Sequence, residues 1–230
     1  MDNGDLYVAA DGAIAPNSSA VWLFQDFVNL KTINFGNCFV TSNVTDMYGM
    51  FRKCTSLTSL DLSDFDTSNV TDLSGMFAYC ASLTSLDLTS FDTSNATDMH
   101  SMFYNCERLT SLDISSFDTS NVTDMDSMFN GCSSLTRLDL GGFDTSAVTT
   151  MGFMFQECSS LTSLDLSSFD TSSVTYMSWM FSWCSSLTSL NLNRFDASAV
   201  TEMDSMFYGC DSLPDIICFD GKILNEFRNR

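Results

Sequence analysis

Apolar residues return at fixed places along the chain, with a period of 26 residues. Phe51 is followed by Phe77, and Leu57 by Leu83, each 26 positions later. A period of about 20 to 50 residues is typical of solenoids, in which each repeat forms one coil. The four columns are Phe51, Phe77, Phe103, Phe129, Phe155, Phe181 and Phe207; Cys54, Cys80, Cys106, Cys132, Cys158, Cys184 and Cys210; Leu57, Leu83, Leu109, Leu135, Leu161, Leu187 and Leu213; and Phe65, Phe91, Phe117, Phe143, Phe169 and Phe195.

The first half of one unit, from Leu57 onward, predicts a strand and then a turn. Its leucines fit L-x-x-L-x-L, the strand signature of leucine-rich repeats. Alternation directs Leu60 and Leu62 inward and leaves Asp61 in solvent. The short polar side chains of Asp66-Thr67-Ser68-Asn69 then favour a tight turn.

The second half of the unit predicts a short helix. Thr71 is a suitable N-cap, and Asp72 places a negative charge at the helix start. The spacing i, i+3, i+4, i+7 predicts an apolar helix stripe. The residues of this stripe are Leu73, Met76, Phe77 and Cys80.

Each coil buries its apolar face only against neighbouring coils, so the array needs a cap at both ends. In front of the repeats, Asp11-Gly12 predicts a turn, and Ser19 begins a predicted helix that carries Trp22, Leu23 and Phe27. Pro214 and a polar tail, residues 225–230, are expected to end the array. We therefore predict an α/β solenoid, a right-handed leucine-rich-repeat coil with a parallel β-sheet on one face and short helices on the other. Its parts are an N-terminal cap (1–29), the solenoid (30–213) and a C-terminal cap and tail (214–230).

The repeat M-F-x-x-C-x-S-L-T-S-L-D-L-S-x-F-D-T-S-N-V-T-D-M, read from Met76 to Met99, resembles the BspA-like leucine-rich-repeat surface proteins. The resemblance covers about residues 17–219. It implies an extracellular or cell-surface solenoid that acts in adhesion, and it supplies no catalytic residues. Residues 1–5 lack the basic and apolar segments of a signal peptide.

Charge excludes several partners. The formal net charge is −20, with 9 Lys and Arg against 29 Asp and Glu, which argues against nucleic acid and anionic membranes. No stretch of about 18 apolar residues suggests membrane insertion. His100 is the only histidine, its helix position is expected to face solvent, and no catalytic motif accompanies it. We therefore predict no enzymatic activity.

Nine cysteines raise the question of disulfides or a metal. Seven lie in the helix stripe, where helices about 8–10 Å apart exceed the disulfide reach of roughly 7 Å. A spacing of 26 matches no zinc motif, so buried reduced thiols are expected. Cys38 falls on a turn position and is expected to be exposed and reactive.

Aspartates form columns as well. One column is expected to stack on the outer face of the sheet. Adjacent strands lie about 4.8 Å apart, so neighbouring aspartates of this column repel each other by roughly 0.8 kcal/mol. It predicts a Ca²⁺ site, an acidic strip for a basic partner, or simply a solvated face. A second column, which begins at Asp66, predicts turn capping. The acidic strip is Asp61, Asp87, Asp113, Asp139 and Asp165.

Residues that break the repeat mark candidate binding sites, because the scaffold does not require them. Arg137 replaces Ser in the outward strand row. Phe153 and Trp179 are one period apart, and Trp179 and Trp183 share a predicted helix face. Exposed aromatics gathered on one side indicate an interaction patch, although burial against the C-terminal tail is the alternative. The candidate partner-binding residues are Arg137, Phe153, Tyr176, Trp179, Trp183 and Tyr208.

The leading hypothesis is a non-enzymatic surface or secreted module that binds a protein or glycan partner, basic proteins among them, without a cofactor. Two alternatives remain. One is ice or mineral binding through regular threonine ladders, and the other is a structural spacer stabilised by Ca²⁺. The ladders are Thr58, Thr84, Thr110, Thr136, Thr162 and Thr188; and Thr45, Thr71, Thr97, Thr123, Thr149, Thr175 and Thr201.

Overall fold

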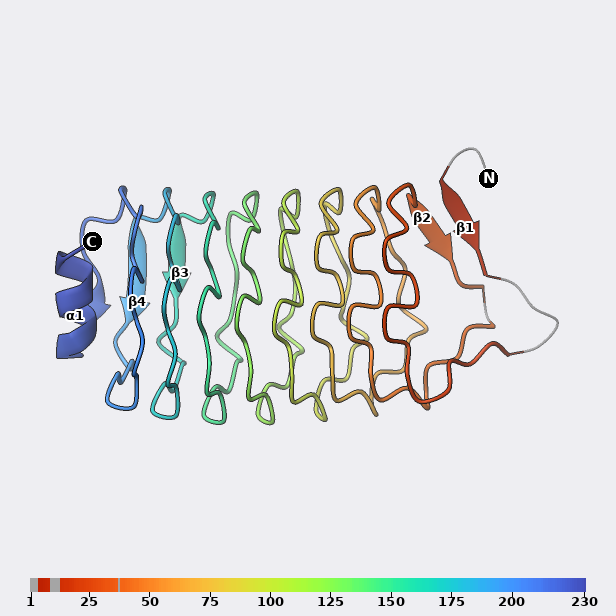
Figure 1. The fold of residues 1–230 in the computed structure, drawn as a ribbon, viewed down its shortest axis with the longest axis horizontal. Helices are drawn as coiled ribbons and strands as arrows, with labels where there is room; N and C mark the ends of the chain where they lie inside the picture. The colour runs from red at the N-terminus through yellow and green to blue at the C-terminus, as the bar shows by residue number, and fades with distance from the viewer. Residues whose placement is uncertain (1–3, 9–12, 37) are drawn as a thin grey trace.

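The chain forms a row of coils stacked along one long axis (Figure 1). The computed structural model describes residues 4–8, 13–36 and 38–230, so the turn predicted at Asp11-Gly12 lies outside the described residues. The predicted repeat solenoid is confirmed. Its regular elements are β1 (Asp5–Tyr7), β2 (Thr32–Asn34), β3 (Ser163–Asp165), β4 (Ser189–Leu192), β5 (Ile217–Cys218) and α1 (Gly221–Arg228).

Equivalent residues of successive coils pair in parallel, as the strand signature predicts. β1 pairs with β2 near the N-terminus, and β3, β4 and β5 form a three-stranded sheet near the C-terminus. The register joins Ser163 to Ser189 and Asp165 to Asn191. In the coils between, the pair Asp87 and Asp113 forms a single parallel bridge. We call the side of the solenoid that carries the acidic strip the sheet face.

The helices predicted within the repeats are wrong; among the described residues, α1 is the one α-helix. The predicted helix at 73–80 is instead a run of three overlapping turns. Amides of Met76, Ala78 and Cys80 donate to carbonyls three residues back, at 3.3, 3.0 and 3.0 Å. The alternate amides donate to the next coil, for example Gly75 to His100 O at 2.9 Å.

Left-handed backbone explains why turns replace the helix. Gly75 has φ 57° and Tyr79 has φ 64°, each at the third residue of a turn, where a type II turn requires positive φ. Residues with positive φ interrupt a right-handed helix. The amides that then have no partner within the helix donate instead to backbone carbonyls of the next coil. The apolar stripe is nevertheless buried, from Leu73 to Cys80. We call residues 46–54 and their equivalents in each coil, as far as 202–210, the turn face.

Stacked phenylalanines form the centre of the core. Phe51 and Phe77 are 5.9 Å apart with ring planes 2° from parallel, and the spacing continues at 5.7 Å between Phe181 and Phe207. Burying each ring contributes roughly 1.5–3 kcal/mol. The ladder ends where Phe227 of α1 meets Phe207 edge-on, at 5.3 Å and 90°.

Both ends differ from the sequence prediction. The C-terminal segment is a capping helix rather than a polar tail, because α1 buries Ile223 and Phe227. Asp220 caps it by accepting from the amides of Lys222 and Ile223. At the front, no helix forms at Ser19. The residues that this helix was expected to carry are exposed, namely Trp22, Leu23 and Phe27.

The cysteines are free, as predicted, and seven are buried in the column from Cys54 to Cys210. The spacing of helices is not the reason, since these coils have none. Each thiol instead donates to a phenylalanine carbonyl of the preceding coil, as Cys106 does to Phe77 O at 3.2 Å. Burial raises the pKa of Cys106 to about 12, which keeps it protonated. Cys38 is half-buried rather than exposed, and donates to Val8 O and Phe35 O.

Among the described residues, no helix has the length and apolar character that crossing a bilayer requires.

Candidate functional site

Five aromatic side chains of the turn face gather near the C-terminal end of the solenoid. Phe153 stacks on Trp179, with ring centroids 6.5 Å apart and planes 5° from parallel, and Tyr176 lies 6.1 Å from Phe153. Tyr208 meets both tryptophans edge-on, at 6.2 Å from Trp179 and 5.2 Å from Trp183. The structure thus brings together the residues that we now call the aromatic patch: Phe153, Tyr176, Trp179, Trp183 and Tyr208.

The backbone at the aromatic patch makes these side chains unusual. Phe153, Trp179 and Trp183 have φ of 56°, 62° and 61°, so the helix face expected for the two tryptophans is wrong. Bulky residues rarely adopt left-handed backbone, which costs on the order of 1–3 kcal/mol. At the position of Phe153 and Trp179 the other repeats carry Gly or Ser with the same positive φ, namely Gly49, Gly75, Ser101, Ser127 and Ser205. The position of Trp183 is more varied and holds Lys53, Tyr79, Asn105, Gly131, Glu157 and Gly209.

The aromatic patch is accessible and lies in a negative field. Trp183 is 45% exposed and Tyr208 is 49% exposed, while the other three side chains are half-buried. The pKa of Tyr176 is raised by burial and, further, by the charges of Asp126, Glu202 and Asp204. The surface therefore offers apolar rings beside carboxylates, which suits a partner with basic groups.

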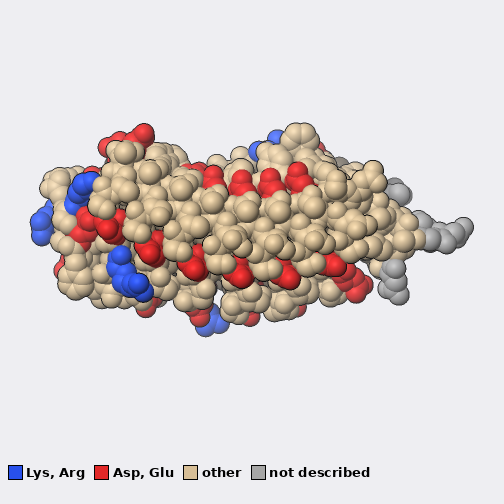
Figure 2. Space-filling model, turned by 90° about the horizontal axis from the view of Figure 1, so that it is seen from below, with Lys and Arg blue, Asp and Glu red and all other residues tan. Residues whose placement is uncertain are grey.

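The acidic strip follows the sheet face. Rows of acidic side chains also run along the long axis on the side of the molecule that Figure 2 shows. Each strip aspartate accepts from the amide two residues on: Asp113 from Ser115 at 3.1 Å, and Asp139 from Gly141 at 3.0 Å. The bond from the Ser115 hydroxyl, followed by the one from its amide, lowers the pKa of Asp113. The strip therefore stabilises turns as well as presenting negative charge.

Arg137 lies among the strip aspartates, as the sequence predicts. It lines a groove of about 730 Å³ on the sheet face together with Asp113, Asp139 and Asp165. Arg137 and the aromatic patch therefore lie on different faces, so the candidate partner-binding residues form two separate sites, as their repeat positions predict.

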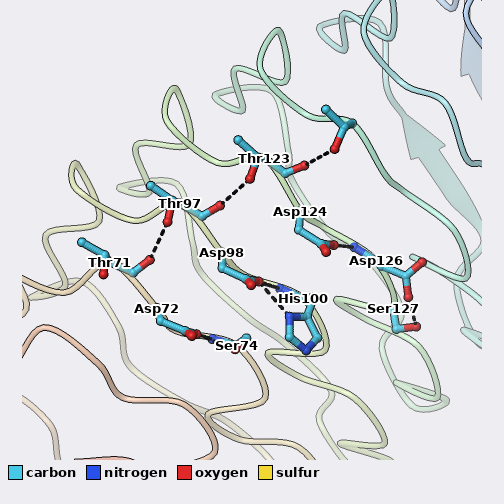
Figure 3. Close-up of polar contacts among 11 residues, drawn as sticks. Thr71, Asp72, Ser74, Thr97, Asp98, His100, Thr123, Asp124, Asp126 and Ser127 are labelled. Atoms are coloured by element: carbon cyan, nitrogen blue, oxygen red, sulfur yellow. Dashed lines mark hydrogen bonds and ion pairs between the residues drawn. The ribbon is translucent and has the colours of Figure 1, made fainter. Parts of the chain in front are cut away.

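A polar cluster on the turn face escaped prediction from the sequence. His100 is only partly solvent-facing: its side chain is 37% exposed, and Nδ1 lies 2.8 Å from Asp98 Oδ1. Asp124 of the next coil pairs in register with Asp98 (Figure 3). One ligand atom from each of Asp98, His100 and Asp124 lies within 4.8 Å of the others. We call these three residues the His–Asp cluster.

Electrostatics at this place reflect partial burial. The hydrogen bond with Asp98 raises the pKa of His100 against the opposing effect of burial. Burial raises the pKa of Asp124 and of Asp126, and each is raised further by a neighbouring carboxylate. Asp124 Oδ1 accepts from the Asp126 amide at 2.8 Å, which fixes its carboxylate relative to the backbone.

A second aromatic group, also missed, lies nearer the N-terminus. Tyr79 and Tyr104 meet edge-on at 5.1 Å, and the Arg52 guanidinium lies 5.4 Å from the centre of the Tyr79 ring. With Tyr48 and His100 they line a hollow of about 180 Å³. The signal was present in the sequence, because tyrosines interrupt repeat positions here as they do at the aromatic patch.

The threonine ladder that begins at Thr45 links the coils rather than capping helices. Thr97 Oγ1 donates to Thr71 O at 3.2 Å, and Thr123 Oγ1 to Thr97 O at 3.2 Å (Figure 3). Since these hydroxyl protons are already donated within the protein, they are not free to donate to an ice or mineral surface.

Comparison with known proteins gives a family. The model of the family described as "Mycoplasma protein of unknown function, DUF285" matches residues 19–138 and 108–219. No curated protein sequence matches the chain.

Several solved structures are similar at low identity. A leucine-rich repeat protein of T. pallidum is 16% identical, over 99% of this chain and 88% of that one, with a TM-score of 0.47. A leucine-rich cell surface protein of Faecalibacterium prausnitzii is 15% identical, over 98% and 89%, with a TM-score of 0.29. A leucine-rich repeat protein of Eubacterium ventriosum is 16% identical, over 81% and 60%, with a TM-score of 0.39.

Proposed function

The chain belongs to the DUF285 family, and we propose that it is a non-enzymatic recognition module that binds a protein or glycan partner at a cell surface or outside the cell. The proposal includes membership in the BspA-like surface proteins and a role in adhesion. It also includes partner binding without a cofactor. Partners with basic groups suit the net charge of −20 best, and nucleic acid suits it least.

One observation carries the proposal: Phe153 and Trp179 occupy strained backbone at a position that the other repeats fill with Gly or Ser. Folding alone favours the smaller residues at these positions, since glycine adopts positive φ without strain. Aromatic side chains, by contrast, supply much of the binding energy at protein interfaces. Strain that the fold does not require supports a role in binding.

A solid-phase screen against immobilised glycans and extracellular-matrix proteins tests the proposal. Repeat-matched variants separate binding from folding: Trp179→Ser copies Ser127 and Ser205, and Trp183→Gly copies Gly131 and Gly209. We expect either variant to weaken a hit at least about tenfold, the equivalent of about 1.4 kcal/mol. Their unfolding midpoints should equal or exceed that of the parent protein.

Arg137→Glu on the sheet face is the control for a general charge effect, and it should leave binding at the aromatic patch unchanged. A large fall in stability in the tryptophan variants would mean that the aromatic patch serves packing instead. A hit that depends on Arg137 and not on the tryptophans would move recognition to the groove of the sheet face.

A further inference from the structure

The His–Asp cluster combines donor types that serve metal binding. The chain has a single histidine, and its ring lies close to carboxylates of two adjacent coils (Figure 3). Imidazole nitrogen with carboxylate oxygen suits Zn²⁺ and related divalent transition metals better than Ca²⁺ or Mg²⁺, which prefer oxygen alone. This chemistry distinguishes the cluster from the all-aspartate strip of the sheet face.

Its geometry is close to that of a coordination shell. Zinc lies about 2.0–2.2 Å from nitrogen and oxygen ligands, which places two ligands of one ion about 3–4 Å apart. The His100 Nδ1 to Asp98 Oδ1 distance is 2.8 Å, and all three ligand atoms lie within 4.8 Å of one another. An ion in place of the shared proton therefore needs only small side-chain adjustments.

Backbone bonds hold the two carboxylates in advance. Asp98 Oδ1 accepts from the His100 amide at 2.9 Å, and Asp124 Oδ1 accepts from the Asp126 amide at 2.8 Å. Bonds of this kind orient metal ligands and reduce the ordering that binding requires. Asp98 and Asp124 also pair directly between their coils, so their spacing is set by the solenoid.

We propose that Asp98, His100 and Asp124 bind one divalent transition-metal ion, with Zn²⁺ the best fit, and that the ion joins two neighbouring coils of the turn face. None of these three residues belongs to the aromatic patch, and Zn²⁺ binding is measured without a partner. Water completes the coordination, since His100 and Asp98 are each about one-third exposed.

Isothermal titration of the full chain without a polyhistidine tag, with Zn²⁺ as the probe, tests the proposal. We expect one ion per chain. The single histidine makes ¹⁵N NMR decisive, because every imidazole signal belongs to His100. Coordination should shift one ring nitrogen strongly.

The repeat itself supplies variants that keep the fold. His100→Ser copies Ser74 and Ser178, and Asp124→Thr copies Thr150. Each should weaken Zn²⁺ binding more than about tenfold, since even indirect partners of metal ligands contribute 10–100-fold. Asp46→Asn is the matched control: Asp46 occupies the same column and caps its turn by accepting from the Tyr48 amide, and its loss should change nothing.

Two further measurements test whether a different residue or a different ion accounts for the binding. Cys38→Ser removes the half-buried thiol, and undiminished binding supports the His–Asp cluster. Ca²⁺ is titrated in parallel; Ca²⁺ binding that persists in His100→Ser would show an oxygen-only site and overturn the proposal. So would unshifted imidazole signals at saturating Zn²⁺, or equal affinity in the parent protein and His100→Ser.

Discussion

Tyr176 covers Gly152 so closely that a β-carbon at Gly152 would overlap the tyrosine ring, and would lie 2.8 Å from Asp126 Oδ1. Gly152 does not have left-handed backbone, so alanine is conformationally acceptable there. The missing side chain at Gly152 therefore makes room for the aromatic patch.

Gly152→Ala should displace Tyr176 from Phe153 and weaken partner binding about tenfold, with the fold retained. NMR of the aromatic ring protons measures the displacement even before a partner is known. Gly142→Ala is the matched control, because a β-carbon at Gly142 meets only Ser115 O, at an ordinary 3.8 Å. An unmoved Tyr176 ring would contradict this account.

The buried threonine column predicts a stability effect. Thr119 Oγ1 donates to Asp144 O at 2.8 Å and accepts from the Asp144 amide at 2.9 Å, joining two coils. Thr119→Val keeps the shape but removes both bonds, and should lower the free energy of unfolding by about 1–3 kcal/mol in urea titrations. Thr110→Val, at an exposed ladder position, should change it by less than about 0.5 kcal/mol. Equal effects of the two variants would refute a special role for the buried column.

The C-terminal cap predicts a localised loss of stability. Phe227 closes the phenylalanine ladder against Phe207, and the Arg230 guanidinium lies 3.7 Å from the centre of its ring. Phe227→Ala should cost about 3–5 kcal/mol. Hydrogen exchange should accelerate most in the last coils, because each coil contacts only its neighbours. Phe219→Ala removes a side chain that is 82% exposed, and should leave exchange unchanged.

Turn-capping aspartates predict the acid response. Hydrogen bonds from the hydroxyl and then the amide of Ser120 lower the pKa of Asp118, and serines act likewise on Asp66, Asp92, Asp144 and Asp170. Their stabilising effect is complete above the unfolded-state pKa of about 3.9 and is lost as pH falls through the lower folded-state value. Melting temperature should therefore decrease between about pH 5 and pH 3.

Asp118→Asn keeps an oxygen that accepts from Ser120 but removes one titrating group. Its melting temperature should fall less steeply with acid than that of the parent protein. A steeper fall in its melting temperature would contradict the stabilising effect assigned to the ionised Asp118.

The inward positions were predictable from sequence because any stacked coil buries the same columns. Phe153 and Trp179 were likewise predictable as neighbours, being one period apart. The path of the backbone could not be predicted in this way. Leu73, Met76, Phe77 and Cys80 are buried whether residues 73–80 form a helix or stacked turns, and the difference lies in where alternate amides donate. That partner belongs to the next coil, so local periodicity does not reveal it.

The His–Asp cluster was hidden for a related reason. His100 and Asp124 are 24 positions apart rather than one full period, so the repeat alone does not align them. Their proximity depends on how neighbouring coils are staggered. At the C-terminus, the charged residues around Ile223 and Phe227 read as a polar tail, although their spacing of four places both on one helix face.

The amides that run from each coil to the next on the turn face constrain how such proteins change in length. Because residue 75 donates to residue 100 and residue 101 to residue 126, every coil presents the same row of donors to its successor. Gain or loss of part of a unit would leave this row mismatched, whereas gain or loss of 26 residues preserves it. Unequal recombination within the gene can therefore place the aromatic patch nearer to or farther from either terminus, in steps of one coil, without altering the aromatic patch itself.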